Sequence, residues 1–97
     1  MAKKQTTKKK AKKKNIEELK PYEIFVLNMK GLMTIQGITP EEMQEYMNVS
    51  KSTFYKRIRE PYSMTMGEMA SVAKKLGESP IAMIAKVMEV SEVIVGA

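Results

Sequence analysis

The chain has 97 residues, enough for one small domain, and it contains neither cysteine nor histidine. These absences exclude disulfides and thiolate metal sites, and they remove the commonest zinc ligand and general base. No apolar run reaches the roughly 18 residues of a membrane span, so the composition is typical of an intracellular protein. We therefore expect no metal, no cofactor, no small-molecule ligand, no membrane contact and no enzymatic activity.

The net charge of +6 is unevenly placed along the chain. Residues 1–14 contain eight lysines and no acid, whereas residues 15–97 carry nine basic and eleven acidic side chains. Such a low-complexity segment buries too little surface to offset its ordering entropy, so we expect residues 1–14 to be disordered alone. Two interpretations of this segment stay open. In the first it is a solubilising tail, in part a cloning remnant. In the second it is an arm that contacts phosphate groups through Lys8, Lys9, Lys10, Lys12, Lys13 and Lys14.

The first predicted helix covers residues 21–35. Pro21 suits its first position, because the missing N–H has no intrahelical partner there. Gly37 ends it. The apolar spacing predicts these inward positions: Ile24, Leu27, Met29 and Leu32.

Four more short helices follow from their capping signals. Thr39 with Glu42 and Thr65 with Glu68 have the spacing of capping boxes, in which hydroxyl and carboxylate satisfy each other's backbone N–H groups. The further signals are the caps Ser50 and Ser79 and the stops Asn48, Pro61 and Gly77. The predicted helices are 40–47, 51–59, 66–76 and 80–89. No hairpin signal appears, so the fold class is all-α with five helices.

The helix at 51–59 has a narrow apolar stripe, because Phe54 and Ile58 are four residues apart. The three-residue link 48–50 predicts a steep angle to the preceding helix. We expect the seam between the two helices to consist of Met43, Met47, Val49, Phe54 and Ile58. The opposite face presents Ser52, Tyr55, Lys56 and Arg59, with Lys51 at its edge. Charges of one sign on one face attract polyanions. Methionine pairs at helical spacing, such as Met29 with Met33 and Met66 with Met69, indicate core filling.

The stretch "ITPEEMQEYMNVSKSTFYKRIREPYSMTMGEMASVAKKLG" resembles the Cro/CI-like (XRE-type) helix-turn-helix family of small phage and bacterial transcription regulators. Residues 49–54, "VSKSTF", match the family's "VSRSTI", and Ala73 with Leu76-Gly77 matches its "LAKALG". Gln44 stands where the family usually has alanine, which implies different helix packing there. The resemblance implies a five-helix lambda-repressor-like domain, which we place at residues 15–90.

The resemblance also implies that helix 51–59 enters the major groove of double-stranded DNA, as in a transcriptional regulator or repressor. The residues expected to read bases are Lys51, Ser52, Thr53, Tyr55 and Lys56. The residues expected to contact phosphate are Thr39, Ser50, Arg57 and Arg59. Four alternatives stay open. The charged residues from Lys51 to Arg59 form only a solvated helix face, Tyr55 covers the edge of the core, Thr53 only caps the helix start, or the whole fold is an adaptor for an acidic protein. The bacterial cytoplasm or nucleoid, with a chromosomal or phage gene, is the location that the family implies.

The C-terminal stretch is more apolar than one short helix can bury. Ile81, Ile84, Val87 and Met88 share a predicted helical stripe. This stripe either completes the core of one chain or forms the seam of a homodimer. We favour the seam, together with the segment 91–97, because helix-turn-helix proteins commonly read two half-sites as dimers.

Overall fold

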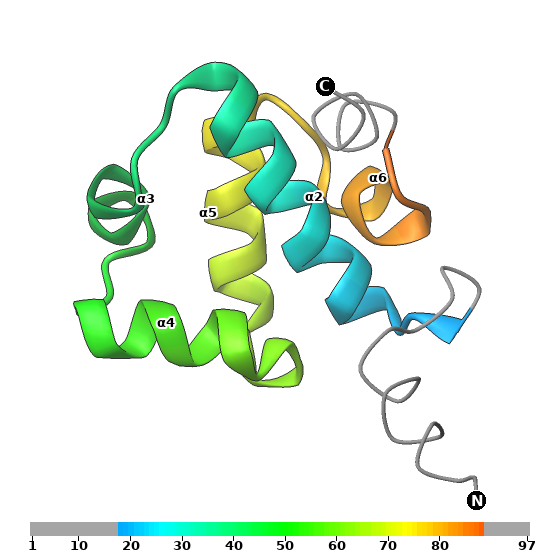
Figure 1. Ribbon diagram of the computed structural model, residues 1–97, viewed down its shortest axis with the longest axis horizontal. Coiled ribbons are helices and arrows are strands. Elements are labelled where there is room, and N and C mark those ends of the chain that lie inside the picture. Colours follow the sequence, from blue (N-terminus) through cyan, green and yellow to red (C-terminus); the bar gives the residue numbers. More distant parts are fainter. Residues whose placement is uncertain (1–17, 89–97) are drawn as a thin grey trace, which may run out of the picture.

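The computed structural model describes residues 18–88 and contains all five predicted helices (Figure 1). They are α2 (Pro21–Gln36), α3 (Pro40–Met47), α4 (Lys51–Arg59), α5 (Met66–Leu76) and α6 (Pro80–Ala85), with a short 3-10 helix, η2 (Pro61–Ser63), after α4. No strand occurs within this range, so the all-α helix-turn-helix fold is confirmed. The predictions for residues 1–14 and 91–97 lie outside the described residues.

Helices α2 and α5 lie side by side at the centre of the domain (Figure 1). Helix α6 packs against α2 on one side. On the other side α3 packs against α5, and α4 follows α3 and contacts η2. The predicted helix-turn-helix unit is therefore supported from behind by the central pair.

Local capping groups explain where the helices begin. Thr39 Oγ1 accepts the N–H of Glu42 at 3.1 Å, and Glu42 Oε1 accepts the N–H of Thr39 at 2.9 Å. Thr65 and Glu68 repeat the arrangement at 3.0 Å in both directions. Both predicted capping boxes are confirmed, and each satisfies backbone donors that a helix start leaves without an intrahelical partner.

The ends of α2, α3 and α5 also agree with the predicted stops. Each ends on a left-handed residue, namely Gly37 at φ 70°, Asn48 at φ 62° and Gly77 at φ 78°. In each case the N–H of this residue returns to carbonyls of the last helical turn. Glycine adopts this conformation freely, and asparagine tolerates it better than most residues.

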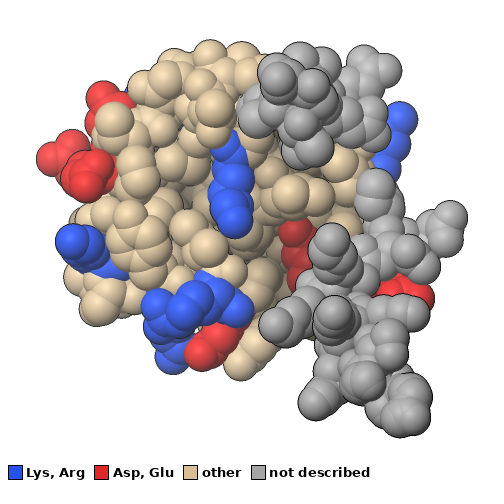
Figure 2. All heavy atoms as spheres, viewed as in Figure 1, with Lys and Arg blue, Asp and Glu red and all other residues tan. Residues whose placement is uncertain are grey.

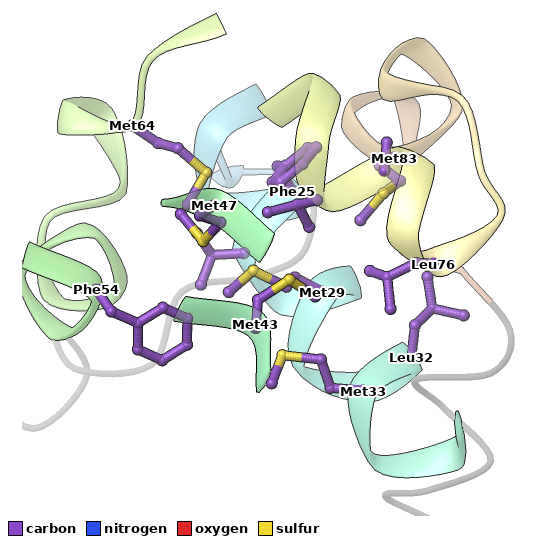
Figure 3. Packing of buried hydrophobic residues seen from close by; sticks show 13 residues of the cluster. Phe25, Met29, Leu32, Met33, Met43, Met47, Phe54, Met64, Leu76 and Met83 are labelled. Atoms are coloured by element: carbon purple, nitrogen blue, oxygen red, sulfur yellow. The ribbon is translucent and has the colours of Figure 1, made fainter. Parts of the chain in front are cut away.

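Methionine fills much of the core, as predicted. The buried cluster includes six methionines: Met29, Met33, Met43, Met47, Met64 and Met83. Figure 3 shows Phe54 reaching from α4 toward Met43 in this cluster. Flexible thioether side chains suit the irregular space between short helices. Met66 is the exception, because its side chain is 84% exposed at the start of α5.

One predicted core position of α2 is wrong. Leu27 is 37% exposed, whereas Phe25, Val26 and Met33 are buried beside the expected Ile24, Met29 and Leu32. The cause is that α5, α6 and η2 all pack against α2, so more than half of its circumference is covered. At about 100° per residue, Leu27 and Lys30 lie on the narrow arc that remains in solvent.

The last helix is shorter than predicted, because α6 ends at Ala85 and Lys86 has extended backbone. The side chain of Asn28, buried in α2, explains this end. Its Nδ2 donates to the carbonyls of Met83 at 2.9 Å and Lys86 at 3.0 Å, and its Oδ1 accepts the N–H of Met88 at 2.8 Å. These bonds take the place of a further helical turn.

The predicted stripe on this last helix is wrong as well. Val87 and Met88 lie beyond the end of α6, and Ile81 is 75% exposed. The buried residue of α6 is Met83, which lies on a different side of the helix from Ile81. Ile84 and Met88 are partly buried against the core.

Candidate nucleic-acid interface

The link between α3 and α4 sets the two helices at a steep angle. Asn48 reverses the chain, and the N–H of Val49 bonds to the carbonyl of Gln44 at 3.1 Å. Val49 packs against the core, and Ser50 caps the next helix. Figure 1 shows α3 seen almost end-on while α4 lies across the view. The link thus turns one long side of α4 away from the body.

Phe54 anchors α4 from its inner side, since its side chain is 1% exposed. Ile58, one turn later, is partly buried against the same cluster. The expected seam of α3 with α4 is confirmed, with Met43 and Met47 buried opposite.

The outward face of α4 is formed by Ser52, Lys56 and Arg59, three or four residues apart and all exposed. Lys51 is exposed next to this face in the first turn. Lys51, Lys56 and Arg59 make no ion pair within residues 18–88. Their positive charges are therefore uncompensated by the described acids, which favours contact with an anionic surface.

The surrounding surface separates the two signs of charge. In Figure 2, Lys and Arg side chains gather over α4, with acidic atoms beside them at one edge, and a separate acidic group lies over α3. The acidic residue that follows α4 is Glu60. Glu41, Glu42 and Glu45 of α3 are exposed. An anionic partner would consequently meet the least repulsion on the α4 side.

Tyr55 does not share the outward face, although the sequence predicted it there. Its ring is partly buried and packs edge-to-face on Phe54, with centroids 5.1 Å apart. Helix α4 is covered over more of its circumference than its apolar stripe indicates, and Tyr55 lies on the flank between core and solvent.

Arg57 is also placed differently from the other cations. Its guanidinium meets Glu68 of α5 in two parallel bonds, Nε to Oε1 at 2.8 Å and Nη2 to Oε2 at 3.2 Å. The side chains are only 18% and 13% exposed. The same Oε1 accepts the N–H of Thr65, so Arg57 joins α4 to the capping box of α5.

This ion pair shifts both titrations. The hydrogen bond to Glu68 raises the pKa of Arg57 above its ordinary value. Burial by itself would raise the pKa of Glu68, but the bonds from Arg57 and Thr65 outweigh it and lower that pKa. Arg57 therefore stays charged and paired with Glu68 of α5, away from the outward face.

The hydroxyl groups predicted to contact DNA are hydrogen-bonded within the protein, at the starts of their helices. Ser50 Oγ accepts the N–H of Thr53 at 3.2 Å and donates to Thr53 Oγ1 at 3.0 Å. Ser50 Oγ and Ser52 Oγ lie 3.3 Å apart. Thr39 holds its own capping box. These groups stabilise the start of each helix in the free protein.

Gln44 of α3 has a buried Nε2 without a hydrogen-bond partner within the described residues. The expected difference in helix packing from the Cro/CI-like family at this position stays a prediction. An amide in that position loses hydration without compensation, which costs stability. The sequence did not reveal three long-range contacts: those of Asn28, the pairing of Arg57 with Glu68, and the bond from Gln36 Nε2 to the carbonyl of Leu76 at 2.9 Å.

Several predictions can be placed only in part. The phosphate contacts Lys8, Lys9, Lys10, Lys12, Lys13 and Lys14 lie outside the described residues.

Within residues 18–88, no group of three acidic, histidine or cysteine side chains could hold a metal ion. None of the described helices combines the length and apolar character needed to cross a bilayer.

Comparison with known families, curated proteins and solved structures finds no match to this chain. The case for a function therefore depends on the geometry of α4 and its surroundings.

Proposed function

We propose that this protein binds double-stranded DNA sequence-specifically, with α4 in the major groove, as a small transcriptional regulator or repressor. One observation carries the proposal: Lys56 and Arg59, which make no ion pair with a described residue, form with Ser52 an exposed outward face on a helix that is anchored from behind by Phe54. An α-helix presented in this way fits the width of the major groove.

The exposed side chains of α4 divide into two roles. Lys51, Ser52 and Lys56 belong to the part of the helix nearest the bases, where lysine donates to guanine O6 or N7. Arg59, at the far end, contacts phosphate and positions the protein. Thr53 and Tyr55 have smaller roles in this arrangement, because the first is engaged with Ser50 and the second with Phe54.

At Ser50, whose hydroxyl caps α4, the backbone N–H groups at the start of this helix favour a phosphate. The predicted phosphate contact at Thr39 is not part of the proposal, because Pro40 lacks an N–H and Glu41 and Glu42 repel an anion at the start of α3. Arg57 is not part of the proposed contact, because Glu68 holds it. The lysines of residues 1–14 would add contacts to the backbone without reading bases.

We further propose that the protein acts as a homodimer on paired half-sites, about 34 Å apart along the duplex. The exposed Ile81 supports a contact on the α6 side. A regulator of this kind would act in the bacterial cytoplasm or nucleoid, whether its gene is chromosomal or carried by a phage.

The decisive test is selection of bound sites from a random duplex library at a fixed salt concentration. We expect a consensus, and a palindromic consensus would show the dimer. Recovery of unenriched sequence, with binding lost to a heparin competitor, would overturn the proposal and favour an adaptor for an acidic protein.

A further inference from the structure

A groove lies beside α4 and opens along one flank of its outward face. It has a volume of about 400 Å³. Lys30 and Thr34 of α2 form one wall, Tyr55 and Ile58 of α4 form the other, and Ile38 and Pro40 close one end. The groove therefore joins the helix that we propose to read DNA to the beginning of α3.

The lining combines apolar surface with a single kind of charge. Tyr55, Ile58 and Pro40 offer apolar faces, Lys30 offers an ammonium group, and no acidic residue lines the groove. The Thr34 hydroxyl is already bonded to the carbonyl of Lys30 at 3.0 Å. An occupant that matches this lining has an apolar ring next to one negative charge.

Lys30 is free to supply its charge outward. It lies on the arc of α2 that remains in solvent, and its side chain makes no ion pair within the described part of the chain. The residues three and four positions away on α2 are Val26, Leu27, Met33 and Thr34, so no acid on this helix neutralises it.

We infer that this groove holds one sugar–phosphate unit of a DNA strand, with Lys30 as a phosphate contact from α2. The deoxyribose ring packs on the apolar walls, and the phosphate meets the ammonium group. The inference rests on the proposed function and extends its DNA surface from α4 to α2. Since α2 is packed against α5 and α6, this contact holds the whole domain, and not only α4, at a defined angle to the duplex.

The test compares Lys30→Ala with Lys74→Ala in full-length protein on the selected duplex and on random duplex, across a salt series. Lys74 is exposed in the last turn of α5 and does not line the groove. Each neutralised phosphate contributes about 0.9 to the slope of log affinity against log salt. We expect the slope for Lys30→Ala to be smaller by about 0.9. A fourfold rise in salt should therefore reduce the affinity of Lys30→Ala by a factor that is about 3.5-fold smaller than the factor for wild type. Lys74→Ala should keep the wild-type slope.

Two further measurements separate a local contact from general attraction. Lys30→Arg should keep the slope, because it keeps the charge. Ethylation of one particular phosphate should impair wild-type binding and have no effect on Lys30→Ala, while the consensus stays unchanged. Equal losses in both alanine variants, an unchanged slope for Lys30→Ala or a shifted consensus would each overturn the groove contact. Absence of any duplex binding by the wild-type protein would instead refute the proposed function itself.

Discussion

Helices α4 and α6 are both short, and each is held by one buried side chain and one polar connection. In α4 these are Phe54 and the ion pair of Arg57 with Glu68. In α6 they are Met83 and the bonds from the buried amide of Asn28. The polar connection is therefore charged and partly exposed in one helix, and neutral and buried in the other.

This difference separates two ways of fixing a helix. A buried neutral amide is independent of salt and of mild changes in pH, whereas an ion pair near the surface depends on both. Helix α4 also has cations on its outward face that make no ion pair with a described residue, so that face contributes little to folding. We infer that α6 is fixed for stability, and that α4 combines a firm inner side with an outer side kept free for a partner.

The largest expected effect concerns the inner side of α4. Phe54→Ala removes a ring that is 1% exposed, and we expect the free energy of unfolding to fall by about 3–5 kcal/mol. Met66→Ala, at an 84% exposed position, should change it by less than about 0.5 kcal/mol. Urea unfolding of both variants measures the difference. Wild-type stability in Phe54→Ala would mean that α4 is rotated about its axis.

The connection of α6 gives the next effect. Asn28→Ala leaves the carbonyls of Met83 and Lys86 without this donor, and we expect a loss of about 1–3 kcal/mol. The loss should be the same at low and high salt. Leu27→Ala, at the neighbouring exposed position, is the matched control and should cost much less. If the loss of stability in Asn28→Ala disappeared at high salt, the neutral hydrogen bonds of Asn28 would not be its source.

The outward face of α4 should affect binding without affecting stability. Lys51→Ala is expected to reduce the preference for the selected site over random duplex by about 1–3 kcal/mol. Arg59→Ala should weaken both duplexes alike, because a phosphate contact does not discriminate. Both variants should melt as wild type does. An unchanged preference in Lys51→Ala would remove that residue from base reading.

The smallest effect is the pH dependence of the α4 connection. The pKa of Glu68 is lowered in the folded protein, so the stability that it adds is present above about pH 4.5 and is lost as the pH falls through the folded pKa. Glu68→Gln should therefore be less stable than wild type at pH 7, by under about 1 kcal/mol. The free energies of unfolding of the two proteins should converge as the pH falls through the folded pKa of Glu68. A constant difference across this range would show that the ion pair is not its source.

The parts of the fold that were predictable depend on near neighbours in the sequence. The start of α3 follows from Thr39 and Glu42, three residues apart, and the end of α5 follows from Gly77. The inward position of Phe54 follows from its spacing to Ile58. Each signal is local, because a cap or a helical stripe needs only a few consecutive residues.

The parts that were missed depend on residues far apart in the sequence. Asn28 bonds to the carbonyl of Met83, 55 residues away, so the apolar periodicity continues where the helix does not. Arg57 resembles its cationic neighbours until the fold brings Glu68 beside it. Leu27 has the spacing of a core residue, and only the three-sided packing of α2 turns it outward.

The methionine-rich core has a consequence for the chemistry of oxidation. The chain has ten methionines and no cysteine, so thioethers hold all of its sulfur. Met66 at 84% exposure is open to peroxide in the folded protein, whereas Met29 and Met43 at 0% are shielded. Sulfoxide forms at such shielded sites only when the domain opens, and the polar product then disfavours repacking. The rate of sulfoxide formation at the core methionines therefore reports how often the domain opens. The rate at exposed Met66 reports the effective concentration of the oxidant in the same sample.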